Sequence, residues 1–381
     1  MVGAIGSWRR RASARLEQPG LSPSGERRFR VATIVVVALF SGGWIAAIVE
    51  TSAAGPPGTG APPAMLSGAV TASPLSPDAP APAAFLIGQA LKSFAGAQTF
   101  RGHSGAVDVL LVNPGDSALT VPGSLPPSVE VALGSAAGGA DTARGTTAPA
   151  GPGIWNVVLR LGGVARAVPG ISVVSMVPFA AKRGGRIGGY TLGSWPYEKG
   201  ARPRSPAYFP PRGFVQVTPQ NQDLHLSDHI RLRDYITKGQ TDVWPKYIAV
   251  SPKELDKIEL TIQEMEREGH PFRLGVISAF RSPSYNYRGG NTEGRAQLSR
   301  HMYGDAMDIY DDPKGTGCMN DLNGDGRVDV ADARTLARAA QRVEQMYPDL
   351  VGGIGVYAPT GAHCGFVHID TRGYRARWGA W

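Results

Sequence analysis

The stretch SRHMYGDAMD, residues 299–308, decides how the C-terminal half of the chain folds. It separates His301 and Asp308 by seven residues, with Gly304 between them. Residues 306–310 can run extended, and a glycine at position 304 allows the chain to turn back on itself. We therefore expect a strand that carries Asp308 to lie beside His301.

A second strand, FVHID at residues 366–370, adds the imidazole of His368. Zinc accepts imidazole nitrogens and carboxylate oxygens, and three protein ligands leave the fourth tetrahedral position for water. The pattern thus predicts a zinc site built from His301, Asp308 and His368. Spacing alone also allows an ordinary structural role for these side chains.

The C-terminal half resembles the zinc D-alanyl-D-alanine carboxypeptidases and related murein endopeptidases, a family that shares its fold with the Hedgehog signalling domain. The resemblance covers about residues 251–381, in three blocks that keep the family's order: SAFRS at 278–282 followed by Asn286, the segment 299–308, and GFVHID at 365–370. Within the second block the matching residues are Ser299, His301, Gly304, Ala306 and Asp308. The resemblance implies a Hedgehog/DD-peptidase zinc fold with the same three zinc ligands.

The resemblance also implies catalytic residues around the zinc ion, which would lower the pKa of water toward about 7. His363, five residues before His368, resembles the family's histidine that acts as general base or stabilises the oxyanion. Asp370 is the alternative base, since a residue two positions along a strand points to the same side. The family often presents a glutamate near the last ligand, and this chain lacks it. Both candidate bases therefore stay open.

Arg281 in the first block would bind the oxyanion or a substrate carboxylate, for which a two-pronged guanidinium is suited. The alternative is a structural salt bridge. By resemblance, the activity is hydrolysis of peptidoglycan peptide bonds by a D-Ala-D-Ala carboxypeptidase or a cross-link endopeptidase. Two alternatives belong to other classes: a non-catalytic zinc- and calcium-containing module that binds the cell wall or signals, and a calcium-dependent adhesion protein built on the N-terminal β-region.

The stretch DLNGDGRVDVAD at residues 321–332 matches a calcium-loop template. Template positions one, three, five, nine and twelve are occupied by Asp321, Asn323, Asp325, Asp329 and Asp332. Gly326 takes the turn, and the carbonyl of Arg327 would supply position seven. The loop resembles those of dockerin and extracellular calcium-binding repeats, although position twelve is usually Glu. It predicts a structural calcium ion that orders the insertion after Asp308, with a plain acidic turn as the alternative.

The chain has two cysteines, Cys318 and Cys364. An even count favours pairing in an oxidising compartment, so we predict a disulfide between the start of the calcium loop and the strand beside His363. Two free thiols, or a contact between Cys364 and the metal, are the alternatives.

The first fifty residues are typical of a segment that targets a protein to a membrane. Residues 1–30 hold seven arginines and two glutamates, and thus +5 of the formal net charge of +8, which argues against a general nucleic-acid-binding surface. Residues 31–49 carry no charge and are long enough to span a bilayer. They predict a single-pass anchor of a bacterial cell membrane, with the basic tail in the cytoplasm and the catalytic domain on the periplasmic or cell-wall side. A cleaved signal peptide, which would give a secreted protein, and a buried core helix are the alternatives.

Residues 51–85 are rich in proline and alanine, carry one charge, Asp78, and predict a semi-extended tether. Residues 86–199 offer short apolar runs separated by Gly, Pro and Ser, which predict a small β-rich domain of sandwich type. Residues 201–381 mix helical and strand patterns without a repeating βαβ order, which indicates an α+β domain.

Within this α+β domain the sequence predicts two helices. Ser251-Pro-Lys-Glu254 predicts a helix start with a capping box, and Gly269 predicts its end. A second helix is expected over residues 330–346, before Pro348. The strands are expected at residues 274–280, 353–357 and 366–370, the last two as a pair.

Overall fold

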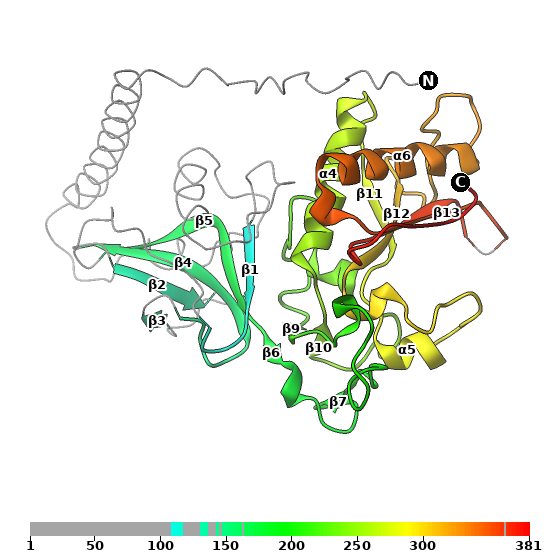
Figure 1. Cartoon of the computed structure of the whole chain (residues 1–381). Coiled ribbons are helices and arrows are strands. Elements are labelled where there is room, and N and C mark those ends of the chain that lie inside the picture. Colours follow the sequence, from blue (N-terminus) through cyan, green and yellow to red (C-terminus); the bar gives the residue numbers. More distant parts are fainter. Residues whose placement is uncertain (1–107, 117–129, 136–141, 145–146, 162–163, 362) are drawn as a thin grey trace, which may run out of the picture. The chain divides into compact units, whose positions relative to one another are not determined.

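The computed structural model describes residues 108–116, 130–135, 142–144, 147–161, 164–361 and 363–381 (Figure 1). The predicted tail at 1–30, anchor at 31–49 and linker at 51–85 lie outside these residues. Among the described residues, no helix is both long and apolar enough to cross a membrane. Sheets and a few helices are mixed along the described chain, which confirms the α+β class.

The first described strands form a five-stranded sheet with the order β1-β5-β4-β2-β3. Its strands are β1 (Asp108–Val112), β2 (Glu130–Ser135), β3 (Thr142–Arg144), β4 (Gly153–Leu161) and β5 (Val164–Ser175). β1 runs parallel to β5, and the other pairs are antiparallel. Leu133, Val157 and Val173 are fully buried. Within the described residues this region forms a single sheet, whereas the sequence predicts a sandwich of two sheets.

A set of short elements follows before the first long helix. It comprises η1 (Phe179–Ala181), η2 (Pro206–Tyr208), η3 (Leu232–Tyr235), the hairpin of β7 (Arg186–Ile187) with β8 (Tyr190–Thr191), and a three-stranded sheet of β10 (Lys246–Ile248), β9 (Gly213–Val217) and β6 (Val177–Pro178). Aromatic side chains supply much of its core: the Trp195 ring contacts Phe179 and Phe214 at centroid distances of 5.4 and 5.6 Å.

The C-terminal elements build a five-stranded sheet with the order β11-β12-β14-β13-β15. Its strands are β11 (Leu274–Ser278), β12 (Ala306–Asp311), β13 (Gly353–Tyr357), β14 (Phe366–Asp370) and β15 (Ala376–Gly379). The helices around it are α4 (Pro252–Arg267), α5 (Pro283–Arg288), η4 (Arg300–Tyr303), α6 (Val330–Met346) and η5 (Pro348–Leu350). Helix α4 packs against α6, and α6 packs on β13 and β14 (Figure 1).

The two faces of this sheet differ in chemistry because successive strand residues point to opposite sides. Met307 and Ile309 of β12 and Val367 and Ile369 of β14 are fully buried in the apolar core that includes the helices. The residues between them, such as Asp308, point to the other face. One face is therefore the hydrophobic core, and the other is available for a polar site.

The predicted helix over 330–346 and the strand pair at 353–357 and 366–370 are confirmed at their bounds. The predicted capping box of the first helix is wrong. Ser251 is the N-cap residue but its side chain accepts no capping hydrogen bond. Glu254 is fully buried, and both its carboxylate oxygens lack a hydrogen-bond partner. The Glu254 side chain points into the protein interior, whereas Lys253 beside it is exposed, so Glu254 does not reach back to the N-cap as a surface carboxylate would.

Candidate metal centre

Five residues, one from each strand of the C-terminal sheet, form a row across it. In the strand register, Asp308 pairs with Ser278 on one side and with His368 on the other. Gly355 pairs with His368 and with Trp378. Residues paired in this way point to the same face of a sheet, so the whole row stands on the polar face.

Asp308 and His368 meet His301 at the middle of this row. Nε2 of His301 lies 3.1 Å from Nδ1 of His368 and 3.2 Å from Oδ2 of Asp308. Nδ1 of His368 lies 2.9 Å from Oδ1 of Asp308. A tetrahedral zinc ion with ligands at about 2.0–2.2 Å requires ligand atoms about 3.3–3.5 Å apart, close to these separations. In the part of the chain that the structure describes, these three buried side chains are the one group of potential ligands that gathers within 4.8 Å.

A tight turn brings His301 to this point. His301 lies in η4, which ends at Gly304 with a left-handed φ of 73°. A Cβ at Gly304 would meet the carbonyl oxygen of Ala249 at 2.3 Å, so the position has no space for a side chain. The predicted glycine turn is thus confirmed. The Nδ1–H of His301 donates to the carbonyl oxygen of Ala279 at 2.6 Å, which leaves Nε2 as the ligand atom.

Asp370 fixes the orientation of the His368 imidazole through a hydrogen bond to the ring nitrogen that faces away from the other ligands. The Nε2–H of His368 donates to Oδ2 of Asp370 at 3.1 Å, which leaves Nδ1 to face the other ligands. Asp370 also accepts hydrogen bonds from the backbone of Gly353 and from the backbone and guanidinium of Arg372. Burial raises the pKa of Asp370, but the hydrogen bonds from His368 and Arg372 hold it well below its ordinary value. Asp370 therefore orients a ligand, and its engaged oxygens are poorly placed for the base role that the sequence left open.

Asp308 is the negatively charged member of the donor set. Burial raises the pKa of the Asp308 carboxyl, yet the two histidines lower it far more and keep the group ionised. Burial lowers the pKa of His368, but its hydrogen bonds to Asp308 and Asp370 raise it to about 9. Without a metal, His368 thus holds a second proton, and that proton lies on the nitrogen that would bind a metal. Two imidazole nitrogens and one carboxylate fit a divalent ion of the zinc type, which would replace the proton.

Arg281 stands beside the ligands, on the loop after β11. Its backbone N–H donates to the carbonyl oxygen of His301 at 3.1 Å, which ties the loop to the metal centre. Nη2 of its guanidinium donates to Oγ of Ser278 at 3.2 Å and lies 3.7 Å from Oδ2 of Asp308. Burial lowers the pKa of Arg281, though the guanidinium stays charged. At 3.7 Å the contact with Asp308 is an ion pair that is longer than a direct hydrogen bond.

The structure confirms the disulfide between Cys318 and Cys364, with Cα atoms 5.2 Å apart. Cys364 is therefore not a metal ligand. The neighbouring His363 packs edge-on against Phe366, at a centroid distance of 5.0 Å, on the strand that carries His368. The Nδ1–H of His363 donates to the carbonyl oxygen of Cys364 at 2.9 Å, which leaves Nε2 as a proton acceptor.

Trp378 is a site residue that the sequence reasoning missed. Its indole lies 5.1 Å from the imidazole of His368, measured between ring centroids. It reaches that position by lying over Gly355, where a Cβ would meet the indole Nε1 at 2.4 Å. Nε1 donates to the hydroxyl of Tyr357 at 2.9 Å. The alternating glycines of the segment GIGVY at 353–357 are the signal that could have indicated a bulky group over this strand.

The carboxylates of the predicted calcium loop do not gather. Asp332 is fully buried and accepts backbone N–H groups of Leu322, Asn323 and Asp329. The other loop side chains likewise accept N–H groups within the loop: Asp321 from Gly324 and Gly326, Asn323 from Asp325, Asp325 from Arg327, and Asp329 from Ala331. The structure closes the loop by hydrogen bonds, and calcium binding stays a prediction.

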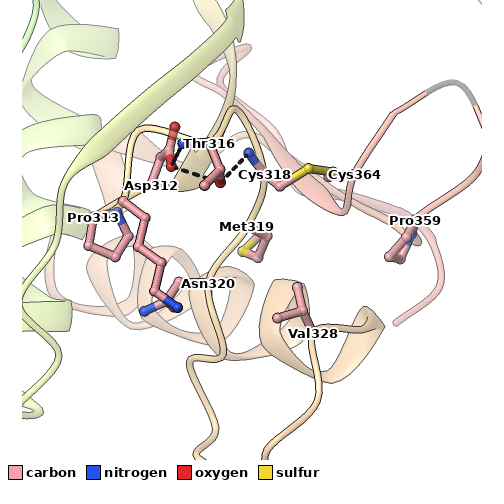
Figure 2. Close-up of a pocket in the computed structure, with 10 residues that line it drawn as sticks. Asp312, Pro313, Thr316, Cys318, Met319, Asn320, Val328, Pro359 and Cys364 are labelled. Carbon is pink, nitrogen blue, oxygen red and sulfur yellow. Dashed lines mark hydrogen bonds between the residues drawn. A yellow bond between two sulfur atoms is a disulfide. The ribbon is translucent and has the colours of Figure 1, made fainter.

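A pocket of about 400 Å³ lies beside the disulfide (Figure 2). Its lining residues are Asp312, Pro313, Lys314, Thr316, Cys318, Met319, Asn320, Val328, Pro359 and Cys364. The Asp312 carboxylate accepts hydrogen bonds from Thr316 at its edge. None of the three candidate ligands lines this pocket, so it is separate from the metal centre.

No protein-family model matches the chain, and no curated protein or solved structure matches it either.

Proposed function

We propose that the C-terminal part of the chain is a zinc metallopeptidase of the Hedgehog/DD-peptidase fold that hydrolyses peptide bonds of peptidoglycan stems. The observation that carries the proposal is the close approach of His301, Asp308 and His368. In both histidines the ring nitrogen that faces away from the other ligands makes a hydrogen bond, which fixes the orientation of the imidazole. A zinc ion held there would supply the Lewis acidity that activates water for attack on an amide. The substrate class comes from the resemblance of the three sequence blocks, which all meet at this site.

The chain's own residues supply the remaining functions. Nε2 of His363 accepts the proton of the attacking water, since its other nitrogen is bonded to a backbone carbonyl. The guanidinium of Arg281 binds a negatively charged oxygen of the substrate, either the oxyanion or a terminal carboxylate. Asp370 and Arg372 keep His368 in its ligand orientation.

The proposal includes the location of the protein. The disulfide is consistent with an oxidising compartment, in agreement with the membrane anchor predicted at residues 31–49. We therefore propose that this domain works outside the cytoplasm, where its peptidoglycan partner is found. Calcium in the loop 321–332 belongs to the same proposal.

Mass spectrometry of muropeptides incubated with the zinc-loaded full chain tests the function. Loss of a terminal D-Ala would identify a carboxypeptidase, and conversion of cross-linked dimers to monomers would identify an endopeptidase. His363→Ala is expected to lower the rate about 10²–10⁴-fold, as for loss of a general base. His270→Ala, which removes a histidine outside the site, is the matched control. No product from zinc-loaded protein would instead support a non-catalytic cell-wall-binding module.

A further inference from the structure

Tyr357 lies at the end of β13, on the polar face of the C-terminal sheet. It is two residues beyond Gly355 and therefore points to the same side as the row that contains His368. Its ring stacks on Phe366 with centroids 4.4 Å apart and an interplanar angle of 8°. Phe366 is in turn two residues before His368 on β14. The stack therefore fixes the phenol ring beside the metal ligands.

A second contact fixes the hydroxyl group. The indole Nε1–H of Trp378 donates to the Tyr357 oxygen at 2.9 Å, while the same indole lies against His368. The indole of Trp378 thus lies between the Tyr357 hydroxyl and the imidazole of His368. Because the Tyr357 oxygen accepts this bond through a lone pair, its own proton is left to be donated to another acceptor.

The surroundings of the hydroxyl keep it protonated. Burial raises the pKa of Tyr357, and the negative charge of Asp308 raises it further, against the opposing effects of Trp378 and Arg281. The phenol is therefore protonated at neutral pH. The strand register places Tyr357 on the same face of the sheet as Asp308 and His368.

We propose that Tyr357 is a catalytic residue that donates a hydrogen bond to the oxygen of the scissile carbonyl as negative charge develops there. This role rests on the proposed peptidase function and adds a second donor to Arg281. A donor held by ring stacking and by an indole is preorganised, so it stabilises the developing charge without reorganisation of its surroundings.

The test is Tyr357→Phe in the zinc-loaded full chain, because phenylalanine keeps the stack on Phe366 and removes the hydroxyl alone. Steady-state hydrolysis of a stem peptide ending in D-Ala-D-Ala is expected to show kcat lowered about 10²-fold, as for loss of one oxyanion donor, with KM nearly unchanged. Calorimetry with a phosphinate analogue of the same dipeptide, which carries a tetrahedral anionic centre, is expected to show a similar loss of affinity. Zinc content measured by atomic absorption should equal that of the wild type.

Tyr374→Phe is the matched control, since it removes the hydroxyl of an exposed tyrosine bonded to Tyr208, and its kcat should equal that of the wild type. An active wild type with an equally active Tyr357→Phe variant would overturn the role of Tyr357 and leave the peptidase function standing. Loss of zinc from the variant would also overturn it, because Tyr357 would then support the ligands instead of the substrate. A wild type that is inactive on all stem peptides would overturn the peptidase function, and the role of Tyr357 with it.

Discussion

Replacing Gly355 by alanine tests the packing of Trp378 over His368. The added methyl group would lie 2.4 Å from the indole Nε1 and 2.5 Å from Cε2, so the indole must move by about 1 Å to restore van der Waals contact. Overpacking of this kind costs about 1–3 kcal/mol. Loss of the hydrogen bond from Trp378 to Tyr357 adds about 0.5–1.5 kcal/mol. We therefore expect Gly355→Ala to lower the free energy of unfolding by about 1.5–4.5 kcal/mol.

Thermal unfolding measures this effect, as a decrease in Tm of roughly 3–18 °C for a domain of about 150–250 residues. Gly361→Ala is the matched control, because nothing lies within 4 Å of a Cβ at that position, and its effect should stay within about 0.5 kcal/mol. In a Trp378→Ala background, which removes the clashing ring, the cost of Gly355→Ala should largely disappear. An equal loss of stability in both backgrounds would refute the packing argument.

Four further predictions concern the metal centre and the charges around it. Asp370→Asn should weaken zinc binding about 10–100-fold in a chelator competition, because His368 loses its carboxylate partner; unchanged affinity would contradict the orienting role. In the metal-free protein, the raised pKa of His368, about 9, means that its protonated form stabilises the fold. That contribution is complete below about pH 6.5 and is lost as the pH rises through 9, so Tm of the metal-free protein should fall over this range and His368→Gln should remove the fall. Burial raises the pKa of Glu254 well above its ordinary value, so its cost to stability grows as the pH rises above about 4.5; Glu254→Gln should raise Tm at pH 8 and have little effect at pH 4. Millimolar calcium should raise Tm of the wild type and have less effect on an Asp325→Ala variant. An equal rise in Tm of both proteins would contradict calcium binding in the loop.

The ligand set could be predicted from the sequence because local rules determine it. A glycine that adopts positive φ and a strand with a period of two residues suffice to bring Asp308 beside His301. His368 was recognisable from the resemblance of its strand, and the register places it directly opposite Asp308. The disulfide followed from the even count of cysteines in a chain that the sequence predicts to be exported.

The rest of the site depends on packing that one sequence does not display. Trp378 reaches His368 because β15 pairs in parallel with β13, two strands separated by β14 in the sequence. Arg372 donates to Asp370 from the turn after β14, and the pattern of the strand alone left Asp370 as the alternative candidate for the base. Glu254 matched a capping box because the template describes a carboxylate in solvent, and the tertiary structure buries this side chain.

Trp378 stands on β15, which is the edge strand beside β13, whereas the three candidate ligands come from η4, β12 and β14. Gly353 and Gly355 have no side chain that could replace the indole beside His368. Local opening of β15 would therefore expose that side of His368 and separate the Tyr357 hydroxyl from its donor, while the three candidate ligands keep their places.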